Sequence, residues 1–170
     1  MIEAIRQAWC AETSAAKIYD TGNAAEGQCA VTALVVQDWL GGDLLRADVP
    51  CYGSHYWNAI PGMGEVDLTR DQFPHEWILP RGEVVPRSRL LEGSRATNSR
   101  TPQRYELLKQ RIAEIAAVQA DSLTSTRQQL AAVTAARDEL ATIAKAWASD
   151  SWRESTAFSR IDELRKVGTP

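Results

Sequence analysis

The order of apolar and polar positions divides the chain into a mixed first portion and a helical second portion. Apolar residues at helical spacing predict a first helix over residues 2–12. The segment 29–40 is apolar almost all round and is followed by two glycines, which favours a buried helix with a glycine C-cap. Residues 13–28 between these helices are rich in Thr, Ser, Asn, Asp and Gly, as is typical of a loop.

Alternating positions after residue 42 predict short strands. Residues 43–49 alternate loosely, residues 54–60 alternate more clearly, and residues 65–69 predict a further short strand. The Pro/Gly turn at 61–64 joins the last two, so we expect them to form an antiparallel hairpin. Residues 70–101 show no regular pattern, and we expect either a loop wrapped over the sheet or a linker.

The second portion is composed of good helix formers and opens with Thr101-Pro102, an N-cap followed by a proline at the first helical position. Asp121-Ser122 is a possible interruption, and Trp152 to Lys166 predicts a last short helix. The apolar stripe of residues 114–170 consists of Ile115, Val118, Leu123, Leu130, Val133, Leu140, Ile143 and Trp147. An isolated helix cannot bury such a stripe. We therefore expect a helical hairpin or a coiled-coil-like element that serves self-association or docking of a protein partner.

Composition and charge narrow the class of protein. The chain has 170 residues and a net charge of −3, which excludes nucleic-acid binding through bulk positive charge. Apolar runs are too short to span a bilayer, and residues 1–6 do not resemble a signal peptide. Three cysteines make a disulfide scaffold improbable and indicate a reducing cytoplasm. We expect one α+β domain over residues 1–101 and a helical extension over 102–170.

Three residues have the chain order of a nucleophilic triad. Cys29 opens the predicted buried helix, where the helix dipole and unpaired N–H groups stabilise a thiolate. His55 lies on one strand of the predicted hairpin and Asp67 on the next. Counting back from the turn places residue 58 opposite residue 67, so that Asp67 is at best diagonal to His55. Cys29 would attack, His55 would carry the proton, and Asp67 would orient the imidazole.

Two further residues are candidates for substrate contacts. Gln28 precedes the cysteine and would assist the Cys29 backbone N–H in binding an oxyanion. Trp57, two positions after His55, is a candidate for a substrate-binding groove, although tryptophans more often anchor a core. We expect no cofactor and no resident metal, and a peptide or another amide as substrate.

These motifs resemble a known family. The stretch from His55 to Asp67 looks like the histidine-to-aspartate segment of transglutaminase-like proteins, and Gly27-Gln28-Cys29 looks like the cysteine box of the papain-like superfamily. Residues 1–113 more closely resemble the YunG-like family of small bacterial proteins. The similar segments are Trp9 to Ser14, Gly27 to Val35, Gly53 to Asn58, Asp67 to Phe73 and Arg104 to Leu108. The resemblance implies a compact papain-like core, a cysteine-bearing helix on a small antiparallel sheet, with peptidase, amidase, deamidase, transglutaminase or acyltransferase chemistry.

Two other interpretations stay open on the sequence. In the first, the domain is a non-catalytic scaffold, and the helical tail carries the function by mediating assembly. In the second, Cys10, Cys29, Cys51 and His55 form a structural zinc site, since Cys51-x3-His55 has a plausible ligand spacing. The paired Cys-x2-Cys ligands typical of such sites are absent.

Overall fold

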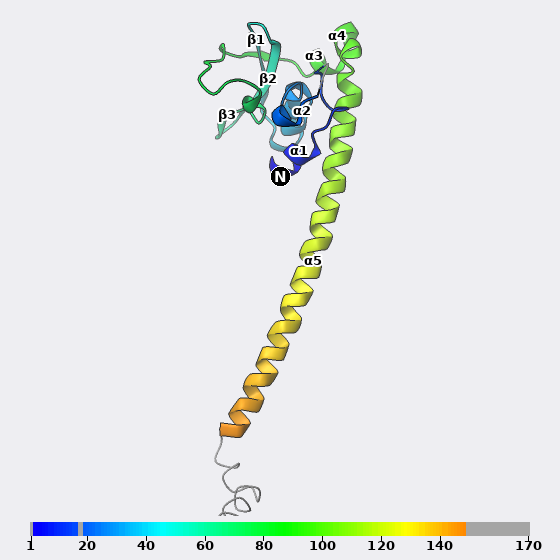
Figure 1. The fold of residues 1–170 in the computed structure, drawn as a ribbon. Helices are drawn as coiled ribbons and strands as arrows, with labels where there is room; N and C mark the ends of the chain where they lie inside the picture. Colours follow the sequence, from blue (N-terminus) through cyan, green and yellow to red (C-terminus); the bar gives the residue numbers. More distant parts are fainter. Residues whose placement is uncertain (1, 17–18, 149–170) are drawn as a thin grey trace, which may run out of the picture. The chain divides into compact units, whose positions relative to one another are not determined.

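The computed structural model describes residues 2–16 and 19–148, and it has an α+β fold with a small antiparallel sheet and a long C-terminal helix (Figure 1). The helices are α1 (Ile2–Ala8), α2 (Cys29–Leu40), α3 (Ser88–Leu91), α4 (Gly93–Asn98) and α5 (Thr101–Ala148), and the strands are β1 (Asp43–Val49), β2 (Gly53–Ile60), β3 (Gly64–Val66) and β4 (Glu83–Val85). The predicted helix over 29–40 is confirmed. The first helix is shorter than predicted because Thr13 Oγ1 bonds the backbone N–H and C=O of Cys10 and turns the chain there.

The four strands have the order β3-β2-β1-β4, and every neighbouring pair is antiparallel. β2 lies in the interior of the sheet, and its residues 55–58 are all buried. Tyr56 packs into the main core, whereas Trp57 joins a smaller apolar cluster with Leu45 and Ala47 on the opposite face. The central strand therefore has neither face open to solvent.

The segment 70–101, expected to be an irregular loop or linker, contains regular elements. Its residues 83–85 form β4, which pairs with β1 at Leu44–Arg46, and α3 and α4 follow. Elements of three to six residues are too short to leave a periodic pattern, and β4 in addition takes its hydrogen bonds from a distant strand. The last predicted strand, 65–69, is also shorter than expected, since β3 ends at Val66.

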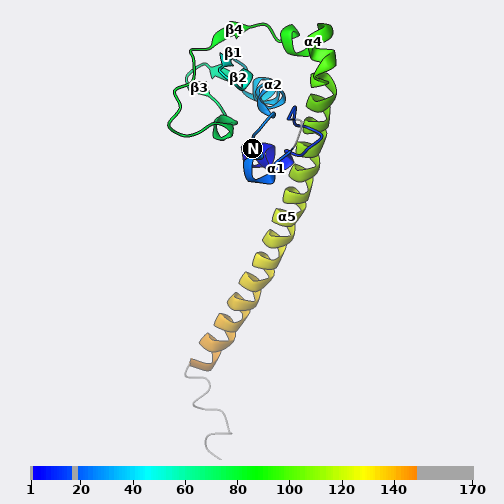
Figure 2. The same ribbon diagram turned by 45° about the horizontal axis from the view of Figure 1, so that its top comes forward.

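Helix α2 forms the centre of the core. Its residues Cys29–Val36 are all buried, and they pack between the sheet and the first turns of α5 (Figure 2). On the sheet side, the buried Asn58 side chain donates to the Ala33 carbonyl at 3.0 Å. On the other side, Tyr105 and Leu108 of α5 belong to the same apolar cluster.

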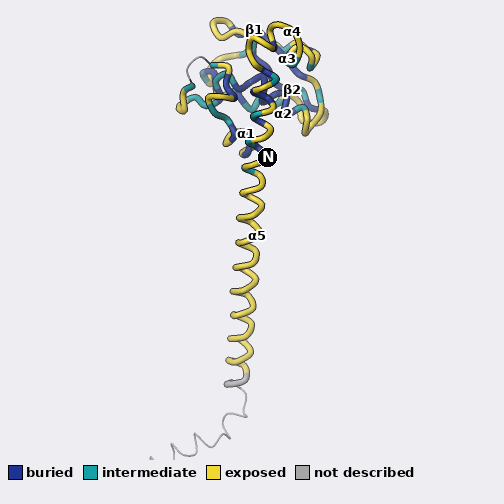
Figure 3. The backbone as a smooth tube through the Cα atoms, turned by 90° about the vertical axis from the view of Figure 1, so that its right-hand side faces the viewer, coloured by how far each residue is buried: buried dark blue, intermediate teal, exposed yellow. Residues whose placement is uncertain are grey.

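Helix α5 runs from Thr101 to Ala148 without the interruption expected at Asp121-Ser122, so no hairpin forms at that point. The chain separates into two units, Met1–Gln119 and Ala120–Pro170. Within the second unit, residues 120–145 are exposed throughout (Figure 3). The predicted helix from Trp152 to Lys166 and the side chain of Trp147 lie outside what the structure describes. Among residues 2–16 and 19–148, no helix is both long and apolar enough to cross a membrane.

Candidate functional site

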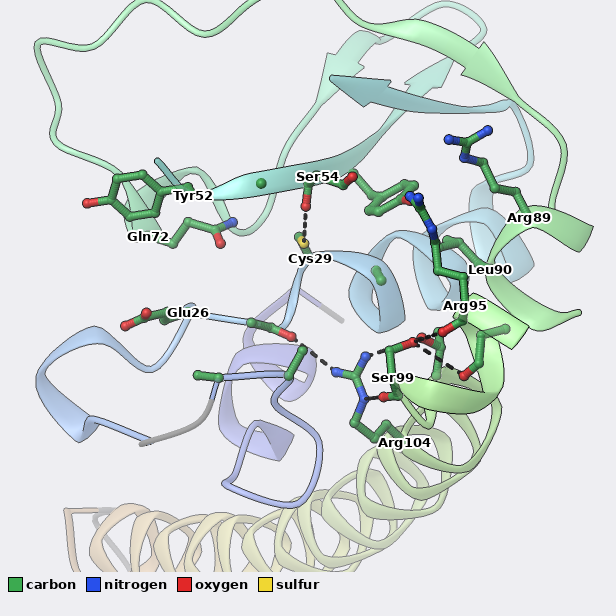
Figure 4. A pocket seen from close by; sticks show the side chains of 18 of the residues that line it. Glu26, Cys29, Tyr52, Ser54, Gln72, Arg89, Leu90, Arg95, Ser99 and Arg104 are labelled. Atoms are coloured by element: carbon green, nitrogen blue, oxygen red, sulfur yellow. Dashed lines mark hydrogen bonds between the residues drawn. The ribbon is translucent and has the colours of Figure 1, made fainter. Parts of the chain in front are cut away.

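A cavity of about 300 Å³ opens beside the N-terminus of α2. Its walls come from the loop before α2, from the start of β2, from the short turn Arg70–Gln72, from α3 and α4, and from the first turn of α5 (Figure 4). Of the three cysteines, all within the described residues, only Cys29 lines this cavity. The structure therefore places the predicted nucleophile in a hollow made by segments far apart in the sequence.

A tight approach of two loops positions Cys29 at the start of α2. Gly27, two residues earlier, has φ +72°, and a Cβ there would lie 2.5 Å from the Ala16 nitrogen and 2.5 Å from Ser14 Oγ. Ser14 Oγ donates to the Glu26 carbonyl at 2.7 Å. Only glycine fits this approach, and the chain can then enter the helix with the cysteine as its first residue.

The predicted pairing of His55 with Asp67 is present. Asp67 Oδ2 lies 2.7 Å from His55 Nε2, and the His55 side chain is buried with 2% exposed. The other carboxylate oxygen, Oδ1, accepts from the backbone N–H and the hydroxyl of Thr69, each at 3.0 Å. Both oxygens are thus held, which orients the carboxylate toward the ring.

The hairpin register explains why this pairing is direct. In the structure Asn58 pairs with Val66 and Ile60 with Gly64, one residue displaced from the predicted register. β3 ends at Val66, so Asp67 begins the turn beyond the strand instead of continuing the ladder. The Asx-type bonds to Thr69 bend the chain back over β2, where His55 lies.

Three further side chains hold the imidazole ring. Trp57 stacks on it with ring centroids 5.2 Å apart and 21° between planes, and the Phe73 ring meets it edge-on at 4.8 Å. Gln72 Nε2 lies 3.1 Å from His55 Nδ1 and 3.0 Å from the Thr69 carbonyl. In this orientation Gln72 donates to the neutral ring, in which Nε2 carries the proton shared with Asp67.

The surroundings of His55 favour its charged form. Burial opposes protonation, but the hydrogen bond to Asp67 and the neighbouring Cys29 sulfur outweigh it and raise the pKa of His55 to about 9. The sulfur itself lies 4.0 Å from the Ser54 carbonyl, next to His55 in β2 (Figure 4). Asp67 and His55 are therefore bonded directly, and the Cys29 sulfur lies in the neighbourhood of the imidazole.

The two predicted substrate-contact residues lie elsewhere. Gln28 is fully buried and its amide donates to the Cys10 carbonyl at 3.0 Å, so this side chain holds the loop before α2. Trp57 is 5% exposed and its indole N–H donates to Glu65 at 2.9 Å. Neither is among the residues that line the cavity. Trp57 supports the His55 ring, and Gln72, which does line the cavity, is the amide beside the imidazole.

Arg104 is a second residue of the site that the sequence analysis did not single out. Although it comes from α5, Arg104 is only 6% exposed, and its guanidinium donates to the carbonyls of Thr13, Gly27 and Ser99 at 2.9–3.2 Å. Burial lowers the pKa of Arg104, while the charge of the nearby Cys29 acts in the opposite direction. Arg104 thus places a buried positive charge near Cys29 in the lining of the same cavity (Figure 4). A lone arginine in a helical pattern gives no signal of this position.

The remaining cysteines lie apart from this group. Cys51 is exposed in the turn before β2 with φ +67°, and Cys10 is partly buried beside Thr13. Across the described part of the chain, no three or more His, Cys, Asp or Glu side chains gather as metal ligands would. The four residues considered as zinc ligands therefore do not lie together; they are Cys10, Cys29, Cys51 and His55.

Comparison with known proteins adds one finding. The family model described as "YunG protein" matches residues 1–117. That range contains the whole cavity and all of the residues around His55. No curated protein and no solved structure matches the chain.

Proposed function

The chain belongs to the YunG protein family, and within the part that the family covers we propose that Cys29, His55 and Asp67 are the triad of a cysteine-dependent hydrolase or acyl/amide transferase. A papain-like or transglutaminase-like core is part of this proposal. The observation that carries it is the 2.7 Å bond from Asp67 to a buried His55 beside the only cysteine that lines the described cavity. A buried, oriented imidazole near a thiol at the start of a helix is the arrangement that nucleophilic catalysis requires.

The proposed reaction starts from a thiolate and an imidazolium. With a pKa of about 9, His55 is protonated at neutral pH, and its positive charge stabilises the Cys29 thiolate. The thiolate attacks the carbonyl carbon of an amide and forms a C–S bond. When the C–N bond breaks, the imidazolium gives its proton to the leaving nitrogen. Asp67 keeps the ring oriented for both transfers.

The second half of the reaction regenerates the thiolate. The neutral imidazole takes a proton from water, for hydrolysis, or from an amine, for transfer, and the new nucleophile attacks the thioester. The C–S bond then breaks and the sulfur leaves as the thiolate beside the imidazolium. The same residues serve both outcomes, and access of water or amine to the cavity chooses between them.

The backbone N–H of Cys29 supports the tetrahedral intermediate in this proposal. Cys29 is the first residue of α2, so its backbone N–H has no acceptor within the helix. The Gln72 amide lines the same cavity, but its nitrogen already lies within hydrogen-bond distance of His55 Nδ1 and of the Thr69 carbonyl, so in this proposal it orients the imidazole. Rotation of the Gln72 amide also lets its oxygen face Nδ1 when the ring is protonated.

The first test is the reactivity of the three thiols on the full chain. Iodoacetamide labelling at pH 6, followed by peptide mapping, compares Cys29 with the exposed Cys51. The proposal expects Cys29 to react at least about tenfold faster, because only a paired thiolate is populated at that pH. If Cys29 reacts no faster than Cys51, the thiolate–imidazolium pair does not exist and the enzyme proposal is wrong.

A second test looks for the acyl-enzyme. With p-nitrophenyl acetate, the wild-type chain is expected to release a burst of about one equivalent of nitrophenolate. Mass spectrometry should then place one acetyl group on Cys29. Cys29→Ala should abolish the burst, whereas Cys10→Ser and Cys51→Ser should leave it largely intact. Equal loss with Cys51→Ser would mean that the nucleophile has been assigned to the wrong cysteine.

A further inference from the structure

The cavity beside Cys29 has two chemically different sides. Tyr52 and Gln72 lie on one side of the sulfur in Figure 4, and Arg89 and Arg95 lie on the other. Tyr52 belongs to an aromatic group, with edge contacts to Phe73 at 5.2 Å and to Trp77 at 5.4 Å. The apolar side therefore suits an uncharged part of a substrate, while the arginine side suits an anion.

The positive charge of the cavity is not balanced by its own lining. Arg89, Arg95 and Arg104 line it, and among its described lining residues Glu26 is the one carboxylate. Figure 4 shows Glu26 on the far side of Cys29 from Arg89 and Arg95. Residues 1–101 as a whole carry 9 Lys and Arg against 13 Asp and Glu. A cationic hollow in an acidic segment is a local departure from the charge of its surroundings.

The three arginines differ in what they already bind. Arg104 is occupied, because its guanidinium donates to three backbone carbonyls and to Thr101 Oγ1. Among the described residues, the guanidinium groups of Arg89 and Arg95 make no hydrogen bond and no ion pair. Two forked donors at the mouth of the cavity are thus available to a ligand.

A neighbouring carboxylate does not neutralise this pair. Asp48 is bonded to Arg46 and to Ser54 Oγ, and the hydrogen bond from Arg46 is the main cause that lowers the pKa of Asp48. Arg95 acts on Asp48 only through charge and contributes least of the causes. Arg95 therefore keeps its donors free although an acid lies in its surroundings.

We propose that Arg89 and Arg95 bind a carboxylate of the substrate, so that the proposed enzyme acts on amides that carry a negative charge close to the bond attacked by Cys29. This inference rests on the proposed function and names its substrate class. The planar guanidinium presents paired N–H donors that match the two oxygens of a carboxylate. The carboxylate comes either from an acidic side chain or from the C-terminal end of a peptide.

The test uses the charge of the labelling reagent and needs no known substrate. Iodoacetate and iodoacetamide modify the same thiols but differ by one negative charge. On the full chain, the ratio of the iodoacetate rate to the iodoacetamide rate is measured for Cys29 and, as an internal reference, for the exposed Cys51. The proposal expects this ratio to be about tenfold higher at Cys29 at low salt, and to fall as salt is added.

Matched variants assign the effect to the two arginines. Arg89→Gln with Arg95→Gln should bring the ratio at Cys29 down to that at Cys51. Arg81→Gln removes one positive charge, as each of the two cavity substitutions does, from an exposed residue that does not line the cavity, and it should leave the ratio unchanged. Equal ratios at the two thiols in the wild type, or a ratio insensitive to the double substitution, would overturn the inference. The absolute iodoacetamide rate at Cys29 tests the proposed function separately.

Protection experiments distinguish the sources of the carboxylate. N-acetylglutamate α-amide presents a side-chain carboxylate, N-acetylglycine presents a terminal one, and N-acetylglutamine amide presents none. Slower iodoacetamide labelling of Cys29 with either acid, and not with the neutral amide, supports the inference. The more protective acid identifies the source. Protection by inorganic phosphate alone, or equal protection by the neutral amide, contradicts a carboxylate site.

Discussion

At the scale of single residues, the candidate site depends on the contacts that fix the Asp67 carboxylate and the His55 ring. Asp67 is fixed through both oxygens, and its partner His55 is enclosed by two aromatic rings and an amide. Such a ring cannot turn away from the carboxylate without breaking packing. The protonation state of His55 is therefore tied to the stability of the fold.

The first prediction concerns pH. The pKa of His55 is raised from 6.5 to about 9, so the stabilisation is fully present below pH 6.5 and is lost as the pH rises through 9. We expect the free energy of unfolding to fall by on the order of 3 kcal/mol over this window. Urea unfolding at a series of pH values measures the fall, and the imidazole resonance of His55 in NMR measures the pKa.

Asp67→Asn supplies the control for the pH prediction. Without the carboxylate, burial of His55 opposes its charge, so the pKa should fall and the stability should depend much less on pH between 6.5 and 9. His75→Gln assigns the two histidine resonances, since these are the only histidines of the chain. A wild-type His55 pKa at or below 6.5 would refute the stabilising role of Asp67.

At the scale of elements, the position of the nucleophile depends on the junction between the loop and α2. Gly27 at φ +72° lets two loops touch, and Arg104 ties the Gly27 carbonyl to α5. The helix can begin at Cys29 only if this junction is formed. Local backbone conformation and a contact between residues 77 positions apart thus act together on one side chain.

The second prediction concerns this junction. Gly27→Ala places a Cβ against backbone and adds the cost of a left-handed conformation, so we expect a loss of about 2–4 kcal/mol in the free energy of unfolding. Gly62→Ala is the matched control, because Gly62 has φ +78° but open space around its Cβ position. That substitution should cost only about 1 kcal/mol. Urea unfolding compares the two, and equal losses would mean that the close approach at Gly27 contributes nothing.

At the scale of the whole molecule, the two units of the chain differ in how their apolar residues are placed. The unit Met1–Gln119 has a continuous buried core. In the unit Ala120–Pro170, the described helical residues include exposed apolar side chains, of which Leu123, Leu130 and Leu140 are 59–66% exposed. Four threonine hydroxyls there donate to carbonyls four residues earlier, which satisfies these donors within the helix. Packing of another helix on the apolar positions would stabilise this segment.

The third prediction is that this segment mediates assembly. We expect the full chain to form a dimer or a larger oligomer in light scattering, and substitution of Leu123, Leu130 and Leu140 by Gln to reduce its mass to that of a monomer. Because these side chains are exposed, the substitutions should leave the Cys29 labelling rate unchanged. A wild-type chain that stays monomeric, and captures no partner through these leucines, would exclude the assembly role and the scaffold interpretation with it.

The sequence by itself determined the elements whose signals are local. The buried helix over 29–40 follows from an apolar run that ends at two glycines, and the strand that carries His55 and the helix from residue 101 follow from side-chain patterns and a cap, all of which depend on near neighbours. The predicted resemblance to the YunG-like family is confirmed over residues 1–117. The order of Cys29, His55 and Asp67 along the chain could also be recognised from the sequence, but the distances between their side chains could not.

Only the tertiary structure decided which side chains meet. A shift of one residue in the hairpin register, together with the early end of β3, brought Asp67 onto His55 instead of to a diagonal position. Gln72 contacts His55 and Arg104 bonds the Gly27 carbonyl, although nothing in the sequence around either residue indicated these contacts. Gln28 and Trp57, predicted to contact substrate, instead bond Cys10 and Glu65 within the protein. β4 formed because β1 had a free edge for it. Contacts of this kind depend on the packing of the whole core, and no local pattern encodes them.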